Sequence, residues 1–219
     1  SADETRPTGL ANSSDLVGRR FMNHNCTAMM AIHPLRRNAA VYQKTIYFND
    51  FYLTGGPNAM PLGNVQLLGK ITTPILQSQT LLPKMIANWI TQHSVDWYLM
   101  SEDLPSHHSR VTVRGDQIIL DWSKSNQETH KALVAKTKSV MRKAGYPILL
   151  SRAFDRDTPS HQCGTAVFGV DPKTSVLDLH CRTHDHPNLF VVDASFLPTS
   201  AAVNPALTIA AQALRVAEH

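Results

Sequence analysis

Long apolar runs are absent from the 219-residue sequence, which limits how the protein can relate to a membrane. No stretch reaches the roughly 18 consecutive apolar residues that a membrane-spanning helix requires. The first four residues, Ser1-Ala2-Asp3-Glu4, differ from a secretion signal, in which a positively charged start precedes an apolar stretch. We therefore expect a soluble, unexported protein with a cytoplasmic location, unless an upstream segment has been removed.

Cysteine is scarce, and the chain contains only Cys26, Cys163 and Cys181. These residues form no Cys-x-x-Cys pair, and their odd number argues against a closed disulfide framework. A reducing compartment fits this pattern best.

A concentrated positive charge is also absent. The net charge is +4 and the isoelectric point is about 9.1, but Lys and Arg are scattered, and the Arg-Arg doublets are Arg19-Arg20 and Arg36-Arg37. Proteins that bind nucleic acids gather basic residues on one face or along one stripe. We therefore expect no nucleic-acid partner.

A glycine-rich turn between a strand and a helix is missing as well. The chain contains no Gly-x-Gly-x-x-Gly motif, which binds a dinucleotide pyrophosphate after the first strand of a Rossmann fold. The C-terminal segment, residues 188–219, is nevertheless of a kind that normally occurs together with such a turn. We therefore expect part of a nucleotide-binding fold to be missing from the sequence.

The middle of the chain predicts an α+β fold, with an antiparallel sheet backed by helices. Turn signals separate runs rich in β-branched and aromatic residues, which predict strands at residues 21–32, 43–53, 64–71, 95–100, 110–114 and 117–122. The stretch Arg114-Gly115-Asp116-Gln117 predicts a tight hairpin turn. Helical spacing predicts helices at residues 82–92 and 126–144. Residues 1–20 are polar and turn-rich and predict a connector.

The end of the chain predicts a short buried strand at residues 189–192 and a helix from about Pro205. Proline suits the first helical position, because its missing N–H would have no partner there, and Asn204 would then cap the helix. Such a helix start presents free N–H groups and a partial positive charge to an anionic ligand edge. An ordinary capped helix is the alternative. The helix is apolar on several faces, which predicts burial against neighbours.

Residues 160–165, with the sequence SHQCGT, place His161 before a Gly-Thr turn. A histidine there can act as a base, because its pKa lies near neutrality. A loop histidine satisfied by its neighbours is the other interpretation. Neither this cluster nor the helix start decides a function by itself.

Together, these segments resemble the C-terminal half of the glucose–methanol–choline (GMC) family of flavin oxidoreductases. In that family, His-x-x-Gly-Thr precedes a Val-Asp-Ala/Gly-Ser strand end and a helix start with Asn-Pro or His, which correspond here to residues 161–165, 192–195 and 204–208. Weaker similarities lie in LVGRRFMNH at residues 16–24 and SEDLPSHHSRV at residues 101–111. Arg20, Asn23 and Ser109 depart from the family pattern.

The resemblance implies FAD as the cofactor and the oxidation of an alcohol group by proton abstraction and hydride transfer to flavin N5. His161 would take the hydroxyl proton and Asn204 would orient the oxygen. The substrate would be a sugar, a pyranoside or another polyol, and no metal is implied. The residues expected to contact the cofactor are Asp193, Ala194, Asn204, Pro205, Ala206 and Leu207.

The resemblance also implies a division of the chain. Residues 1–20 would be a connector from the FAD domain, and residues 21–158 would form the substrate-binding domain. Residues 159–219 would return to the FAD-binding domain, which their strand and helix complete. Because the glycine-rich motif is absent, we expect the nucleotide-binding Rossmann half upstream or on another polypeptide, and the chain alone to be inactive.

Two other functions compete with this interpretation. The histidine-rich residues 180–186, together with His161 and Cys163, could complete a tetrahedral zinc site, although paired ligand spacing is lacking. A non-catalytic carbohydrate-binding module is the second alternative. Its stacking platforms would be Trp89, Trp97, Tyr98 and Trp122, although core positions are the commoner use of such residues.

Overall fold

The computed structural model describes every residue except 1, 43, 157 and 159, and the chain divides into two compact units. The first, called the sheet unit below, comprises Asn25–Ser101 and Gln127–Thr158. The second, called the site unit, comprises Ser1–His24, Glu102–Asn126 and Pro159–His219. Both units are assembled from stretches that are separated in sequence. The division into a connector, a substrate-binding domain and an FAD segment stays a prediction.

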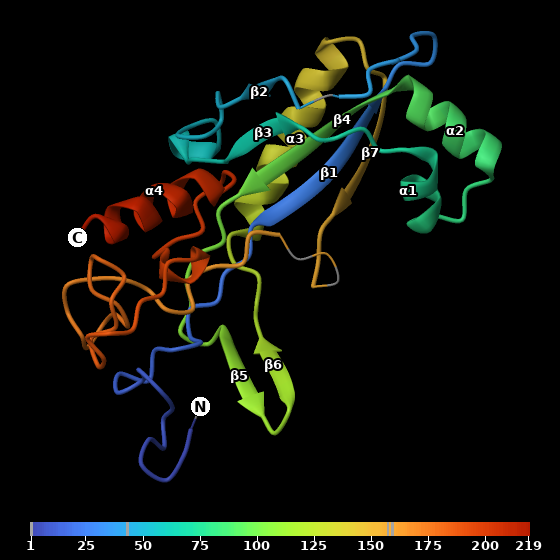
Figure 1. Ribbon diagram of the computed structural model, residues 1–219. Helices are drawn as coiled ribbons and strands as arrows, with labels where there is room; N and C mark the ends of the chain where they lie inside the picture. Colours follow the sequence, from blue (N-terminus) through green and yellow to red (C-terminus); the bar gives the residue numbers. More distant parts are fainter. Residues whose placement is uncertain (1, 43, 157, 159) are drawn as a thin grey trace. The chain divides into compact units, whose positions relative to one another are not determined.

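The sheet unit is built on five antiparallel strands in the order β2-β3-β4-β1-β7 (Figure 1). The inner strand β1 pairs with β4 on one side, where Met29 lies opposite Trp97, and with the edge strand β7 on the other. The strands and helices of this unit are β1 (Asn25–Ile32), β2 (Tyr47–Phe48), η1 (Pro57–Ala59), β3 (Asn64–Leu67), α1 (Thr73–Ser78), α2 (Lys84–His93), β4 (Ser94–Ser101), α3 (Gln127–Lys143) and β7 (Ile148–Ala153).

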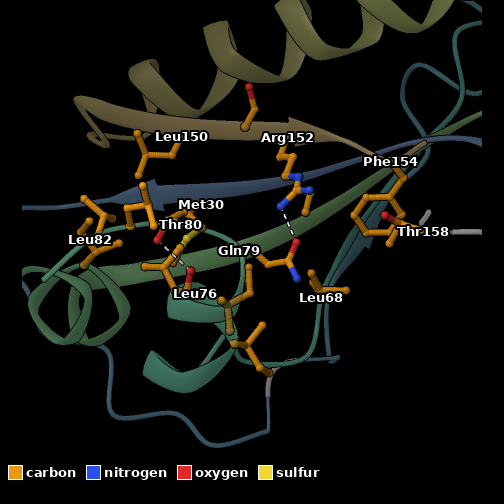
Figure 2. A pocket seen from close by; sticks show the side chains of 16 residues that line it. Met30, Leu68, Leu76, Gln79, Thr80, Leu82, Leu150, Arg152, Phe154 and Thr158 are labelled. Atoms are coloured by element: carbon orange, nitrogen blue, oxygen red, sulfur yellow. Dashed lines mark hydrogen bonds between the residues drawn. The ribbon is translucent and has the colours of Figure 1, made fainter. Parts of the chain in front are cut away.

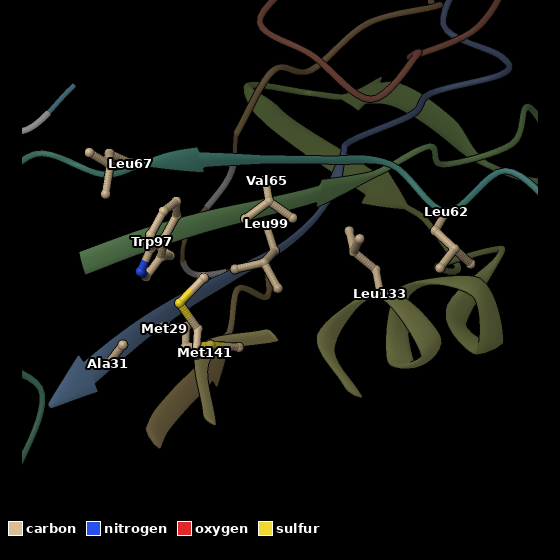
Figure 3. Packing of buried hydrophobic residues seen from close by; sticks show 9 residues of the cluster. All are labelled: Met29, Ala31, Leu62, Val65, Leu67, Trp97, Leu99, Leu133 and Met141. Atoms are coloured by element: carbon tan, nitrogen blue, oxygen red, sulfur yellow. The ribbon is translucent and has the colours of Figure 1, made fainter. Parts of the chain in front are cut away.

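The main core of the sheet unit lies between α3 and one face of the sheet. Met29 and Ala31 of β1 and Leu99 of β4 pack against Leu133 and Met141 of α3 (Figure 3). Successive side chains of a strand point to opposite faces, so Met29 and Ala31 share the face that α3 covers. Burial of this apolar face against α3 holds the helix on the sheet.

The opposite face of β1 has a second, smaller core. Met30 and Ile32 point to this side and pack against Leu76 of α1 and against Ala87 and Ile90 of α2. The strand β1 is therefore buried on both faces, which explains why its sequence is an almost continuous apolar run rather than an alternating one.

The site unit contains little regular structure, namely β5 (Arg110–Arg114), β6 (Gln117–Asp121), η2 (Ala194–Phe196) and α4 (Ala206–Ala217). Its core includes Leu177 and Phe196, against which Ile209 and Val216 of α4 pack. The other side of α4 is open, and Leu207 is 83% exposed. Within the described residues, α4 has no fully buried side chain. The site unit therefore leaves part of the apolar surface of α4 exposed.

The α+β fold with an antiparallel sheet is confirmed. The strands expected at residues 64–71, 95–100, 110–114 and 117–122, the helices at 82–92 and 126–144, and the hairpin at Gly115-Asp116 are present with ends shifted by a few residues. The strand expected at 21–32 begins at Asn25, because residues before it pair within the site unit instead: the N–H of Phe21 donates to the carbonyl of Ser109.

Other expectations were wrong. Of the strand expected at 43–53, the described residues form only β2, because the N–H of Tyr52 donates to the carbonyl of Asn49 in a turn; residue 43 lies outside the described residues. The strand expected at 189–192 is reduced to one bridge, between Arg182 and Phe190. The last helix begins at Ala206, with Pro205 at its cap. The structure adds α1 and β7, which the sequence pattern did not predict.

The core between α3 and the sheet can be tested with Leu133, which is fully buried. Leu133→Ala leaves a cavity under α3 and should lower the free energy of unfolding by about 2–5 kcal/mol. Urea unfolding followed by far-UV circular dichroism measures this loss. Ser139→Ala, at an exposed position of the same helix, is the control and should change stability by less than about 0.5 kcal/mol. Equal effects of the two substitutions would contradict this account of the core.

Candidate functional site

His161 lies between His24 and Asn204 in the site unit. Its Nδ1 is 2.8 Å from Nδ1 of His24, which is 137 residues away in sequence. Its Nε2 is 3.2 Å from Nδ2 of Asn204, which is 43 residues away. The two histidine rings meet edge to face, with centroids 4.9 Å apart. The structure thus brings together His161 and Asn204, and it adds His24 as a third member.

The backbone around His161 is shaped by two residues in the left-handed region. His161 has φ of 58° and Gly164 has φ of 88°. The N–H of Gly164 donates to the carbonyl of Ala194 at 3.3 Å, and the N–H of Ala166 donates to that of Ser195 at 2.9 Å. The histidine loop is therefore hydrogen-bonded along the segment that contains η2.

His24 is buried, with 2% of its surface exposed. Its Nε2 lies 2.5 Å from the carbonyl oxygen of Ser200. Burial lowers the pKa of His24 to about 4, and the nearby ring of His161 acts in the same direction. The backbone carbonyls of Ser200 and Ala201 and the charge of Asp103 oppose this effect but do not outweigh it. His24 is therefore neutral at pH 7.

Asp103 is the buried carboxylate beside this cluster. Oδ2 accepts the backbone N–H of Asn23 at 3.1 Å and the indole N–H of Trp122 at 3.0 Å. Oδ1 accepts the backbone N–H and the hydroxyl of Ser125, at 3.0 and 2.7 Å. Four donors thus satisfy the carboxylate, which removes much of the cost of burying it.

Two further contacts join Asp103 and Asn23 to the histidine pair. The hydroxyl of Ser200 lies 2.9 Å from the backbone nitrogen of Asp103 and 3.1 Å from its carbonyl oxygen. The side-chain oxygen of Asn23 accepts the N–H of Ser160, next to His161, at 2.9 Å. The stretches that resemble the family at residues 16–24 and 101–111 therefore converge on the same site.

The comparisons with known proteins identify the family of the chain. A family model described as GMC oxidoreductase matches residues 105–213, which include His161 and Asn204. The chain belongs to the GMC oxidoreductases. It is 30% identical over its whole length to the fructose dehydrogenase large subunit of Gluconobacter japonicus, covering 43% of that protein. It is 29% identical over its whole length to 2-methyl-1,2-propanediol dehydrogenase of Mycolicibacterium austroafricanum, covering 44% of it.

A solved structure shares the fold. The crystal structure of pyridoxine 4-oxidase from Mesorbium loti aligns over 92% of this chain and 43% of that one, with a TM-score of 0.54 and 20% identity. The chain spans less than half the length of the curated relatives named above. This GMC chain therefore matches one portion of longer proteins.

The residues expected to contact the cofactor lie at two turns of the site unit. Asp193 caps η2, because its Oδ1 accepts the N–H of Ser195 at 2.8 Å. The carbonyl oxygen of Ala194 accepts a hydrogen bond from the N–H of Gly164. Pro205, Ala206 and Leu207 form the start of α4, where Ala206 and Leu207 are exposed. Cofactor contact by all six expected residues stays a prediction.

The N-terminus of α4 is able to receive an electron-rich ligand edge. Its first N–H groups have no partners inside the helix. Within the described part of the chain, no side chain caps it, because the Asn204 amide is directed at His161. The helix has 12 residues, so its positive end is fully developed. Members of the GMC family generally bind FAD, whose ring has carbonyl oxygens that can accept such N–H donors, and contact between the two stays a prediction.

The zinc alternative finds no support in the described residues, which contain no group of three His, Cys, Asp or Glu side chains able to hold a metal. His180 stacks on His219, and Nε2 of His184 lies 3.0 Å from the hydroxyl of Ser175. All three cysteines are buried free thiols. Among these residues, no helix is both long and apolar enough to cross a membrane.

The aromatic residues that supported a carbohydrate-binding module lie mostly in the core. Trp97, Tyr98 and Trp122 are buried. Trp89 is partly exposed and stacks on His93. The core interpretation is therefore confirmed for three of the four residues.

The sheet unit has a pocket of its own, with a volume of about 1060 Å³, on the face that α1 and α2 border (Figure 2). Its lining is mainly apolar and includes Met30, Leu76 and Phe154, while Arg152 hydrogen-bonds to Gln79 within it. The described residues that line it include no His, Cys, Asp or Glu. The pocket can cover apolar groups, and these described residues supply no imidazole or carboxylate to accept a proton.

His24 and Asp103 are the site residues that sequence reasoning missed. Both lie in stretches already compared with the family, but neither had a role there. The signal that could have drawn attention to Asp103 is an acidic residue followed, 19 and 22 residues later, by Trp122 and Ser125, which can both donate hydrogen bonds. His24 has no comparable local signal, because its partners are far away in sequence.

The histidine loop depends on Gly164. A Cβ there would lie 2.5 Å from the carbonyl oxygen of Arg20 and 2.4 Å from Cε of Met22. Gly164→Ala should therefore destabilise the chain by the cost of the left-handed backbone plus roughly 1–3 kcal/mol for the clash. Gly115→Ala is the matched control, because it also has positive φ but its Cβ would meet no described atom within 4 Å. Denaturant unfolding measures both, and a Gly164→Ala loss no larger than the control loss would contradict the prediction.

The buried His24 predicts a pH dependence of stability. Between the ordinary histidine pKa of 6.5 and about 4, the unfolded chain binds a proton that folded His24 does not. Stability should therefore fall as the pH falls through this window, by up to about 1.4 kcal/mol per pH unit from this group, and should level off below it. The difference in unfolding free energy between the wild type and His24→Gln, measured from pH 7 to pH 4, isolates the contribution of His24. A difference that does not vary with pH would refute the predicted pH dependence.

Proposed function

We propose that this chain supplies the catalytic base of an FAD-dependent GMC oxidoreductase that oxidises an alcohol group. His161 is the base and Asn204 is its partner at the substrate oxygen. The observation that carries the proposal is the contact of Nε2 of His161 with the Asn204 amide beside the open start of α4. Family membership supports the same chemical class.

In the proposed reaction, each of these residues has a different role. His161 takes the hydroxyl proton through Nε2, while the amide of Asn204 donates a hydrogen bond that orients the oxygen. As the proton leaves, the alcohol carbon becomes a carbonyl carbon and its hydrogen departs with the electron pair. When bound, FAD supplies the acceptor for this hydride. The start of α4 presents fixed positive dipoles to the cofactor edge that gains charge.

The substrate we propose is a sugar, a pyranoside or another polyol. The names of two relatives, a fructose dehydrogenase and a 2-methyl-1,2-propanediol dehydrogenase, refer to compounds with several hydroxyl groups. A neutral base and an amide suit a neutral hydroxyl group, and His24, His161 and Asn204 place no charged side chain beside it.

Activity requires a second part in this proposal. The chain has no Gly-x-Gly-x-x-Gly motif to bind the pyrophosphate of FAD, so an N-terminal FAD-binding half must provide that contact. It can belong to the same precursor or to a separate chain, and this chain alone should be inactive. A cytoplasmic location is part of the proposal, because the three cysteines are free thiols.

The test uses the flavin-loaded enzyme that contains this chain, assayed with sugars and polyols and an artificial electron acceptor. His161→Ala should lower kcat by about 10²- to 10⁴-fold, because it removes the base. Asn204→Ala should lower kcat/KM by about tenfold, the value of one orienting hydrogen bond. His108→Ala, at an exposed position, is the control and should leave turnover unchanged.

Flavin absorbance must be equal in all variants for this comparison, because a loss of cofactor would also lower turnover. Unchanged turnover in His161→Ala at full flavin occupancy would sink the proposed function. Turnover with apolar alcohols but not with sugars or polyols would refute the proposed substrate class. It would not contradict the role of His161 as the base.

A further inference from the structure

We infer that His24 is a positioning residue that fixes the ring tautomer of His161, so that the lone pair of His161 lies at Nε2. This inference deepens the proposed function and rests on it for its catalytic meaning. It is carried by three contacts in the site unit: Ser200 to His24, His24 to His161, and His161 to Asn204.

The first step concerns the outer nitrogen of His24. Nε2 lies 2.5 Å from the carbonyl oxygen of Ser200. A carbonyl oxygen can only accept a hydrogen bond, so Nε2 of His24 must carry a hydrogen. A neutral imidazole has one ring hydrogen, so Nδ1 of His24 is then an acceptor.

The second step concerns the contact between the two rings. The nitrogens Nδ1 of His24 and Nδ1 of His161 are 2.8 Å apart, so one of them must donate to the other. A doubly protonated His24 could be the donor, but burial opposes that charge and lowers its pKa to about 4. His161 therefore donates from Nδ1 at neutral pH.

The charged groups around His24 do not reverse this assignment. Asp103 is the acidic side chain whose charge favours protonation of His24. Its carboxylate is already occupied by four donors, from Asn23, Trp122 and Ser125. His161 opposes a second positive charge at His24. The backbone carbonyls of Ser200 and Ala201 also favour the charged form, but desolvation is the largest effect.

The hydrogen on Nδ1 determines the state of the other ring nitrogen of His161, Nε2. With its hydrogen on Nδ1, a neutral His161 has its lone pair at Nε2, where the amide of Asn204 lies 3.2 Å away. The amide donates to this lone pair, and the hydroxyl of a substrate must bind at the same nitrogen to be deprotonated. Without an acceptor at Nδ1, both tautomers of His161 would be accessible, and one of them cannot accept the proton at Nε2.

The experiment reads the ring protons directly in the full chain. Histidine labelled with ¹⁵N and long-range ¹H–¹⁵N correlation spectra distinguish protonated from bare ring nitrogens. At pH 7, His161 should show a hydrogen on Nδ1 and His24 a hydrogen on Nε2, with signals assigned by their loss in His161→Gln and His24→Leu. A wild-type spectrum with the hydrogen of His161 on Nε2 overturns the inference.

The variant His24→Leu removes the acceptor at 2.8 Å and leaves the more distant hydroxyl of Ser160, at 3.4 Å from Nδ1, so His161 should shift toward a mixture of the two tautomers. His108→Leu is the control, because His108 is exposed, and it should leave the His24 and His161 signals in place. A folded His24→Leu whose His161 signals still match the wild type overturns the inference. A merely structural role of His24 would not change the tautomer of His161.

A titration of the wild-type protein keeps the inference testable even if His24→Leu does not fold. His161 should keep one tautomer, whenever it is neutral, over the whole range in which His24 stays neutral. Mixed tautomers of neutral His161 at pH 7 would overturn the inference. This outcome can be distinguished from a failure of the proposed function. If the tautomer is confirmed but His161→Ala keeps full turnover, only the role of His161 as the base is refuted. If His161 is essential for turnover but carries its hydrogen on Nε2, only the role of His24 is refuted.

Discussion

The site unit depends on the buried carboxylate of Asp103. Its four hydrogen bonds and the contacts of Ser200 with its backbone tie together stretches that begin near residues 23, 103 and 200. An unpaired buried carboxylate would be costly, so these donors stabilise the folded unit by satisfying it. The same contacts fix the Ser200 carbonyl and the Asn23 amide, which hold His24 and the loop of His161.

The two units use different physical means to place their residues. In the sheet unit, strand pairing and the packing of α3 on the sheet determine position, and apolar burial supplies the stabilisation. In the site unit, little regular structure is present, and side chains bond to backbone groups instead. Left-handed residues such as His161 and Gly164 turn the backbone sharply, which regular elements do not allow.

Local signals explain which parts could be predicted from the sequence. The period of α3, the hairpin at Gly115 and the apolar run of β4 are each contained in a few consecutive residues, and they were predicted with small shifts. The strand β7 was missed because residues 148–153 pair as an edge beside β1, 116 or more residues earlier, so no local pattern marks the pairing. The strand at 43–53 was expected from composition, but Asn49 and its turn interrupt the pairing.

The chemical type of the candidate site could be predicted from the sequence, but the contacts that determine the role of each residue could not. His161 and Asn204 were selected through a resemblance of motifs, whereas the contact of His161 with His24 spans 137 residues and has no local pattern. The roles of the two histidines differ because their surroundings differ. Burial keeps His24 neutral, and its outer nitrogen is committed to a backbone carbonyl. His161 therefore receives a fixed acceptor on one side and is left with a basic nitrogen on the other, which no property of either residue type determines by itself.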